Sequence, residues 1–354
     1  MNINPLVIGD LVARLPIIQG GMGVGVSLSG LASAVAKAGG IGVISSAQIG
    51  FKEEDFETNT SEANIRALKK HIKISKENSE GGIIGVNIMV ALKDYAMQVK
   101  AAIESGVDLI ISGAGLPTNL PEYTKDSSVK IAPIVSSGKA ANVILKMWDR
   151  RYGVTADLII IEGPMAGGHL GFSKEDIEKH PNLGEIFSEV KEVVEGYSKK
   201  YNKNIPIAVA GGIYDGFDIA KYIKLGADGV QMATRFVTTE ECDAHINFKK
   251  AYMESTKDTI GIVSSPVGMP GRAVMNEFVD KTKNGRIKVT KCYNCLTPCN
   301  PADTPYCITK ALINAVNGEI DNGLVFCGEN AYKCDKIVKV KDLMDELRRE
   351  IEEA

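Results

Sequence analysis

The chain has 354 residues, of which 44% are hydrophobic and 24% are charged, and its formal net charge is -3. This is ordinary globular composition, and the lack of a basic excess argues against nucleic acid as a partner. No apolar run reaches the roughly 18 residues of a membrane span, and the N-terminal residues carry no export signal. We therefore expect a cytoplasmic protein that does not bind membranes.

Short apolar runs alternate with stretches of helical pattern from residue 16 to residue 235. Eight of these runs predict strands, at residues 16–21, 41–46, 84–90, 107–113, 129–137, 156–163, 206–212 and 229–235. Each run is almost continuously apolar, which is typical of strands in a parallel sheet covered by helices. Eight strands in strict alternation favour a closed (β/α)₈ TIM barrel over an open doubly wound sheet.

Helical patterns fill most of the connections and part of the remaining chain. We expect helices at 29–40, 61–77, 93–106, 138–151, 183–202, 217–226, 243–256, 309–318 and 340–354, with only a short helix within 116–128. In the last of these, Leu343, Leu347 and Ile351 lie four residues apart and predict an amphipathic helix that docks on the rest of the protein. Residues 1–256 are thus interpreted as the barrel. Residues 257–354 are interpreted as a cysteine-rich and helical appendage that packs on it, with irregular chain at 264–276.

Function in such barrels gathers at the C-terminal ends of the strands. Gly211 and Gly212 end the seventh predicted strand, and Ala233 and Thr234 end the eighth. Many barrels bind a phosphate with these two loops, although a tight turn without a ligand is the alternative. The glycines of "GGMGVG" at 20–25 are spaced Gly-x-x-Gly-x-Gly, which does not match the dinucleotide fingerprint Gly-x-Gly-x-x-Gly.

The stretch "EGPMAGGH", residues 162–169, ends the sixth predicted strand. His169 is the only one of the four histidines at a strand end, where an imidazole would project into the site and exchange a proton near neutral pH. A packed or helix-capping histidine is the alternative. We therefore take His169 as the candidate catalytic residue.

Five motifs in this order, "PIIQGGMG", "GVNIM", "EGPMAGGH", "PIAVAGGI" and "GVQMATRF", resemble the FMN-dependent nitronate monooxygenases, formerly called 2-nitropropane dioxygenases. The same motifs are similar to those of the flavin-dependent enoyl-ACP reductases II. The resemblance covers roughly residues 10–255 and implies an FMN-binding TIM barrel.

The resemblance also implies which residues contact FMN. Backbone at Gly21 and Met22 would lie against the isoalloxazine, Asn87 would hydrogen-bond the flavin or its ribityl chain, and Glu162 would lie near the ribityl hydroxyls. The contacts to the flavin edge, the phosphate and its neighbourhood would come from Gly167, Gly168, Gly211, Gly212, Gln231, Met232, Ala233 and Thr234.

Two activities share this implied flavin site. A nitronate monooxygenase would oxidise an alkyl nitronate such as propionate 3-nitronate with O₂, giving a carbonyl compound and nitrite. An enoyl-ACP reductase would use NAD(P)H to reduce an enoyl thioester. In either case His169 would face a small-molecule substrate, and a homodimer is the candidate assembly. A phosphate-binding barrel enzyme without flavin is a further alternative, but no predicted strand ends in the lysine that many such enzymes use.

Six of the seven cysteines lie between Cys292 and Cys334. Cys292, Cys295 and Cys299 are separated by two and three residues, and Cys307 lies eight positions after Cys299. The first three thiolates at this spacing can hold one metal ion or an iron–sulfur cluster, with Cys307, Cys327 or Cys334 as the fourth ligand. Reduced thiols with a structural role are the alternative, and disulfides are disfavoured in a chain without an export signal.

Overall fold

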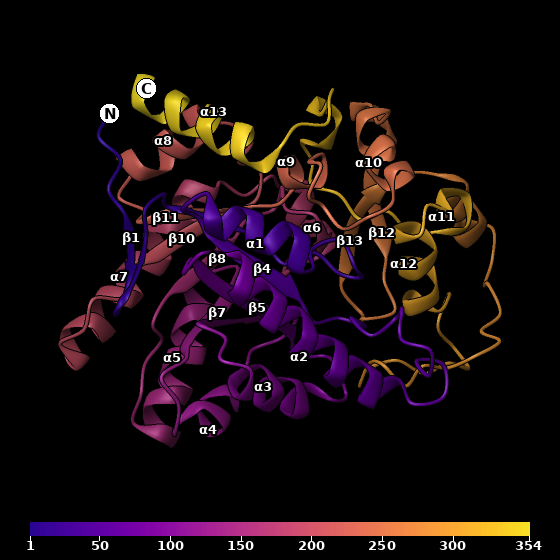
Figure 1. The fold of residues 1–354 in the computed structure, drawn as a ribbon, viewed down its shortest axis with the longest axis horizontal. Helices are drawn as coiled ribbons and strands as arrows, with labels where there is room; N and C mark the ends of the chain where they lie inside the picture. The colour runs from indigo at the N-terminus through magenta and orange to yellow at the C-terminus, as the bar shows by residue number, and fades with distance from the viewer.

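The structure is a computed structural model that describes residues 1–354. At its centre eight parallel strands close into a barrel in the order β10-β11-β3-β4-β5-β6-β7-β8 (Figure 1). The strands are β3 (Ile17–Gln19), β4 (Ile41–Ser45), β5 (Ile83–Met89), β6 (Leu109–Gly113), β7 (Lys130–Val135), β8 (Ile159–Glu162), β10 (Ile207–Ala210) and β11 (Gly229–Met232). The predicted TIM barrel is confirmed, and each strand lies within a predicted run except β5, which begins one residue before its run.

Helices connect the strands and cover the outside of the barrel. They are α1 (Ser29–Lys37), α2 (Thr60–Asn78), α3 (Tyr95–Glu104), α4 (Leu120–Thr124), α5 (Gly138–Tyr152), α6 (Lys174–Glu178), α7 (Leu183–Tyr201), α8 (Gly216–Lys224), α9 (Thr234–Val237) and α10 (Ile246–Met253). Only α4, of five residues, falls in the segment 116–128, as expected. Local sequence fixes the ends of α5, since the Ser137 side chain accepts a hydrogen bond from the Ala140 N–H and Gly153 closes the helix at φ +67°.

Three aspartates fasten the N-terminal end of the barrel. Asp108 and Asp228 stand directly before β6 and β11, and Asp157 stands two residues before β8. Each carboxylate accepts a hydrogen bond from an N–H of the first two residues of the preceding strand. The three bonds are all 2.8 Å long, from Ile84, Ile131 and Ile207. The strand that follows each aspartate begins too far along the barrel to accept a hydrogen bond from this N–H group, so the aspartate side chain accepts it instead. The aspartates thereby set the stagger of the strands.

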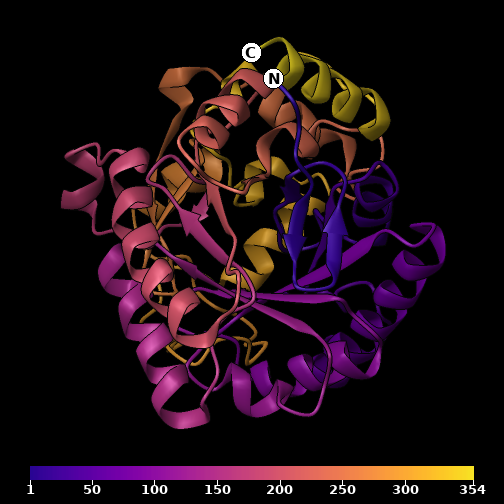
Figure 2. The same ribbon diagram turned by 90° about the vertical axis from the view of Figure 1, so that its left-hand side faces the viewer.

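A small hairpin, β1 (Leu6–Ile8) and β2 (Leu11–Ala13), lies against this same end (Figure 2). Leu6 and Ile8 are fully buried and join the apolar side chains of the barrel interior in one cluster. The hairpin therefore closes the N-terminal end and leaves the C-terminal end as the open one.

Residues 257–328 lie at the C-terminal end of the barrel, whereas the last helix of the chain lies beside α1 and α8 (Figure 1). Our interpretation of 264–276 as irregular chain is wrong: β12 (Ile260–Ser264) and β13 (Pro270–Val274) form an antiparallel hairpin. β13 also pairs with the two-residue strand β9 (Gly168–His169), so a third antiparallel strand comes from the barrel itself. Glycine and proline interrupt the apolar alternation here, so the sequence gives little strand signal.

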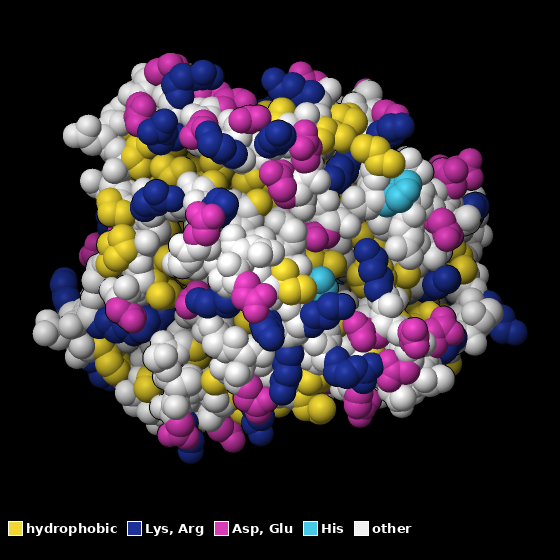
Figure 3. Space-filling view, in the orientation of Figure 1, with side chains coloured by type: hydrophobic (Ala, Val, Ile, Leu, Met, Phe, Trp, Pro, Cys, Tyr) yellow, Lys and Arg dark blue, Asp and Glu magenta, His cyan; other side chains and the backbone are white.

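Three more helices complete the chain: α11 (Glu277–Lys283), α12 (Ile308–Val316) and α13 (Val340–Glu353). α13 packs against α1 and α8, and its buried side chains include Leu343, Leu347 and Ile351, as predicted. The division of the chain into domains at residue 256 stays a prediction. No helix combines the length and the apolar character needed to cross a membrane. Basic and acidic side chains are interspersed over the face shown in Figure 3.

Candidate active site

One cavity of about 250 Å³ lies at the C-terminal end of the barrel. The structure brings together all thirteen residues proposed from the sequence, because every one of them lines this cavity. They are Gly21, Met22, Asn87, Glu162, Gly167, Gly168, His169, Gly211, Gly212, Gln231, Met232, Ala233 and Thr234. Most of the other lining side chains are apolar, and none is a lysine or an arginine.

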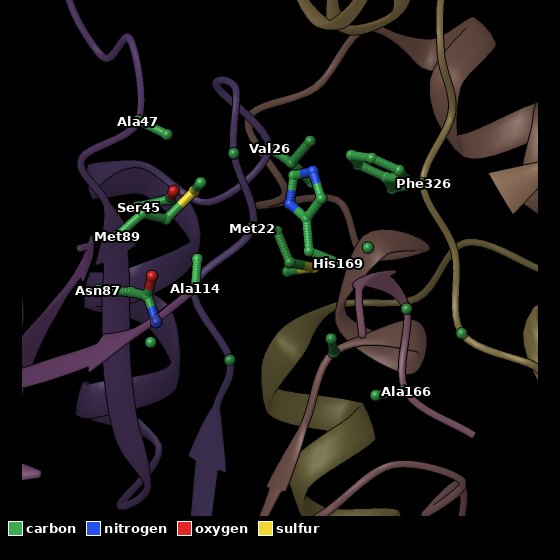
Figure 4. Close-up of a pocket in the computed structure, with 18 of the residues that line it drawn as sticks. Met22, Val26, Ser45, Ala47, Asn87, Met89, Ala114, Ala166, His169 and Phe326 are labelled. Carbon is green, nitrogen blue, oxygen red and sulfur yellow. The ribbon is translucent and has the colours of Figure 1, made fainter. Parts of the chain in front are cut away.

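His169 occupies one wall, across the cavity from Asn87 (Figure 4). Its Nε2 lies 2.7 Å from the Ser265 hydroxyl, and the Phe326 ring meets it edge-on with the ring centres 5.0 Å apart. The Ser265 oxygen accepts a hydrogen bond from the Val267 N–H at 3.3 Å, which favours donation of the hydroxyl proton to Nε2. In that arrangement Nδ1 carries the proton of the neutral ring. Burial lowers the pKa of His169 to about 4, so the imidazole is neutral at pH 7.

Arg272 on β13 holds the loop that precedes His169. Its guanidinium is buried and donates hydrogen bonds of 2.6 Å to the carbonyl oxygens of Pro164 and Ala166. It also forms an ion pair of 3.1 Å with Glu329. Because β13 pairs with Gly168–His169 as well, backbone and side-chain bonds from the C-terminal segment both fix the position of the histidine.

Two acceptors on the barrel side of the cavity lack partners. The Glu162 carboxyl at the end of β8 forms no hydrogen bond or ion pair in the protein, and burial alone raises its pKa to about 8. The side-chain oxygen of Gln231 on β11 is buried with no hydrogen-bond partner. Buried polar atoms are rarely left unpaired, so the Gln231 oxygen indicates a ligand that donates hydrogen bonds, and the half-buried Glu162 carboxyl faces the same cavity.

Glycines shape the cavity where the backbone comes closest to it. Gly211 and Gly212 have φ values of +95° and +86°, a region that favours glycine. A Cβ on Gly21 would lie 2.4 Å from that of Asn87, so a larger residue at 21 would displace the Asn87 side chain. The sequence therefore keeps the backbone accessible at these strand ends.

The sequence model for "Nitronate monooxygenase" matches residues 5–350. The chain belongs to the nitronate monooxygenase family. A "Probable nitronate monooxygenase" of Staphylococcus saprophyticus is 30% identical over 79% of this chain and 81% of its own length. The match to the family extends through the C-terminal segment, so our expectation of a resemblance limited to residues 10–255 was too narrow.

Other relatives differ in the activity that their names describe. A Mycobacterium tuberculosis protein, named (3aS,4S,5R,7aS)-5-hydroxy-7a-methyl-1-oxo-octahydro-1H-indene-4-carboxyl-CoA dehydrogenase, is 27% identical over 76% of this chain and 66% of its own. The structure of FabK from Thermotoga maritima has a TM-score of 0.73 at 27% identity and covers 96% of this chain and 93% of its own. Nitroalkane oxidase from Streptomyces ansochromogenes also has a TM-score of 0.73, with 96% of each chain covered, but at 21% identity it supports the fold alone. The family and its relatives make this chain a flavin-dependent oxidoreductase.

The cavity fits a flavin nucleotide. The unpaired oxygens of Glu162 and Gln231 can accept hydrogen bonds from ribityl hydroxyls. The left-handed backbone at Gly211 and Gly212 offers N–H groups to a phosphate, as loops at this end of TIM barrels often do. Since no lysine or arginine lines the cavity, the phosphate would be bound by backbone N–H groups and the Thr234 hydroxyl without a cationic side chain.

Of Cys292, Cys295, Cys299 and Cys307, only Cys295 reaches the cavity, together with the adjacent Leu296. All seven cysteines are free thiols. No three His, Cys, Asp or Glu side chains converge closely enough to hold a metal ion, so the structure as it stands presents no single-ion site.

Sequence reasoning missed the residues on the C-terminal side of the cavity. Ser265 precedes a proline and glycine-rich stretch, and Phe326 follows a 3₁₀ turn (Ile320–Asn322), so neither carries a periodic signal. Their importance is visible only in the structure, where both contact His169, about 100 and 160 positions earlier in the chain.

Proposed function

We propose that this chain is an FMN-dependent nitronate monooxygenase, which oxidises alkyl nitronates such as propionate 3-nitronate with O₂ to a carbonyl compound and nitrite. The observation that carries the proposal is the neutral His169 on the wall of a largely apolar cavity. When bound, FMN supplies the one-electron chemistry that side chains lack. Membership of the nitronate monooxygenase family supports the same activity.

His169 would hold the substrate in place. With Nε2 engaged by Ser265, Nδ1–H is free to donate a hydrogen bond to a nitronate oxygen. Phe326 limits rotation of the ring, and the apolar lining excludes water around the alkyl group. A histidine whose pKa is about 4 is a weak base, so we propose that the enzyme takes the preformed nitronate rather than deprotonating a neutral nitroalkane.

FMN would be held by the residues proposed from the sequence. The glycine backbone at 211–212 would bind the phosphate, and Glu162 and Gln231 would accept hydrogen bonds from the ribityl chain. Because burial raises the pKa of Glu162 to about 8, this carboxyl is mostly protonated at pH 7 and adds no full negative charge near the phosphate.

The test is nitrite formation from propionate 3-nitronate under air by the yellow, FMN-loaded protein. We expect His169→Ala to lower turnover at least tenfold while FMN stays bound. His180→Ala, a change at an exposed histidine, is the matched control and should leave turnover intact. A protein that takes up no FMN, or that forms no nitrite, would remove this proposal.

One observation favours a second activity, reduction of an enoyl thioester with NAD(P)H. An anionic nitronate would find no cationic side chain in the cavity, whereas an uncharged acyl group suits the apolar lining. The M. tuberculosis relative is likewise named for a CoA compound. In this reaction His169 would orient the thioester carbonyl. Bleaching of the flavin by NADH without oxygen, followed by recovery on adding an enoyl thioester, would identify a reductase.

A further inference from the structure

A second cavity, of about 220 Å³, lies between α9 and α13, and we call it the Arg235 cavity (Figure 1). No residue that lines it also lines the active-site cavity. Its charged lining consists of three basic side chains, Arg235, Lys333 and Lys336, and two acidic ones, Asp335 and Glu346. This cavity therefore serves neither the flavin nor the substrate proposed above.

Arg235 is the buried cation of this cavity, with only 9% of its surface exposed. Its Nη2 donates a hydrogen bond of 3.0 Å to Glu346, and this is the only hydrogen bond that the guanidinium makes, although the group carries five N–H donors. Donors removed from water need acceptors, because an unpaired buried donor costs free energy. The free N–H groups of Arg235 therefore require an acceptor within the cavity.

Two lysines add positive charge to the same cavity. The guanidinium carbon of Arg235 lies 4.9 Å from the centre of the Tyr214 ring, and Lys333 Nζ lies 5.3 Å from it. The ion pair of Arg235 with Glu346 is the only one among the lining residues, so Lys333 and Lys336 have no carboxylate partner. Three cations and two carboxylates leave a net charge of +1 on the lining.

Guanidinium and ammonium groups around one space are typical of sites for oxyanions. A carboxylate offers two oxygens in one plane, whereas a phosphate group offers oxygens in several directions. The donors here belong to three side chains on two separate segments of the chain, which favours the tetrahedral group. We propose that the Arg235 cavity binds the phosphate group of a small molecule.

The Arg235 cavity is built on the same two loops as the proposed FMN phosphate site. Tyr214 follows Gly212 by two residues, and Arg235 directly follows Thr234. The segment that carries both lysines also holds these loops, since the Asn330 side chain donates a hydrogen bond of 2.8 Å to the Gly212 carbonyl. A ligand in the Arg235 cavity would thus contact both loops without touching the flavin, whichever substrate the active site takes.

The test is equilibrium dialysis of the full chain against radiolabelled inorganic phosphate, in excess FMN and at fixed ionic strength. Excess FMN keeps the phosphate out of the active-site cavity. We expect one phosphate per chain with a Kd of about 1 mM or less, and acetate at the same concentration should not displace it.

Variants of opposite charge locate the bound ion. Lys333→Ala, at an exposed position, should raise the Kd about fivefold, and Asp335→Asn, also exposed, should lower it about twofold. Arg235→Gln should raise the Kd more than about tenfold, and circular dichroism checks that its fold survives the loss of the Glu346 ion pair. Lys139→Ala, at an exposed lysine of α5, is the matched control and should leave the Kd unchanged.

Three results would overturn the proposal. The absence of saturable binding would show that water alone satisfies the donors of Arg235. A Kd that neither Lys333→Ala nor Asp335→Asn changes would place the bound phosphate elsewhere on the protein. Displacement of phosphate by acetate at a lower concentration would identify a carboxylate site instead.

Discussion

The unpaired Glu162 carboxyl makes a prediction about stability that does not depend on the substrate. In the unfolded chain this group ionises near its ordinary pKa of 4.5, whereas burial raises its folded pKa to about 8. Between these values the folded protein binds more protons than the unfolded one. The contribution of Glu162 to the free energy of unfolding must therefore fall as the pH rises from 4.5 to 8 and stay constant above pH 8.

The size of the effect follows from the two pKa values. At about 1.4 kcal/mol per pH unit, the interval from 4.5 to 8 corresponds to about 5 kcal/mol. This is an upper limit, because Glu162 reaches the cavity, where water screens its charge. Glu162→Gln keeps the shape but removes the ionisation, so its stability relative to the wild type should increase through the same pH range.

The assay is urea denaturation of both proteins without FMN, from pH 5 to pH 9, because bound FMN would stabilise the folded state on its own. The same substitution at exposed Glu195 serves as the control and should show no such trend. A difference between Glu162→Gln and wild type that stays constant from pH 5 to pH 8 would refute the reasoning.

Three further predictions concern the cavity and the Arg272 side chain that holds the loop before His169. Gly212→Ala should weaken FMN binding at least tenfold in a fluorescence titration, because the φ of Gly212 is +86° and the new Cβ would lie 2.9 Å from Met165 Sδ. The control is Gly196→Ala, at an exposed position within α7, which should stabilise the protein by about 1 kcal/mol. Arg272→Met should lower the free energy of unfolding, measured by urea denaturation, by about 3 kcal/mol, because two carbonyl groups and Glu329 lose their partner. Arg272→Lys should recover part of this lost stability. Since His169 titrates near pH 4, kcat/KM should show no histidine inflection between pH 5.5 and 8, and an inflection near 6.5 that is lost in His169→Ala would contradict the assignment.

The barrel could be predicted because its signal is local and repeated. Eight buried apolar runs in alternation with helices leave few architectures, and the strand ends of a TIM barrel converge at one face. That rule placed Asn87, Glu162 and His169 in one cavity although they are up to 82 residues apart.

The C-terminal side of the site could not be predicted in the same way. A strand of two residues, Gly168–His169, has no periodicity, and its partner β13 contains a proline and a glycine within five residues. Pairing between segments 100 residues apart depends on three-dimensional complementarity, which no pattern within either segment records. The unpaired acceptors on Glu162 and Gln231 are likewise visible only once the surrounding structure is known.

The sheet formed by β9, β12 and β13 has a consequence for the order of events in synthesis. Since a chain emerges from the ribosome with its N-terminus first, the barrel strands are available for pairing before Ser265, Arg272 and Phe326 have been made. His169 then lacks the Ser265 hydroxyl and the Phe326 ring that orient it. A flavin that enters during translation would meet a cavity open to water on one side, so cofactor loading should be completed only after the last third of the chain has folded over the barrel.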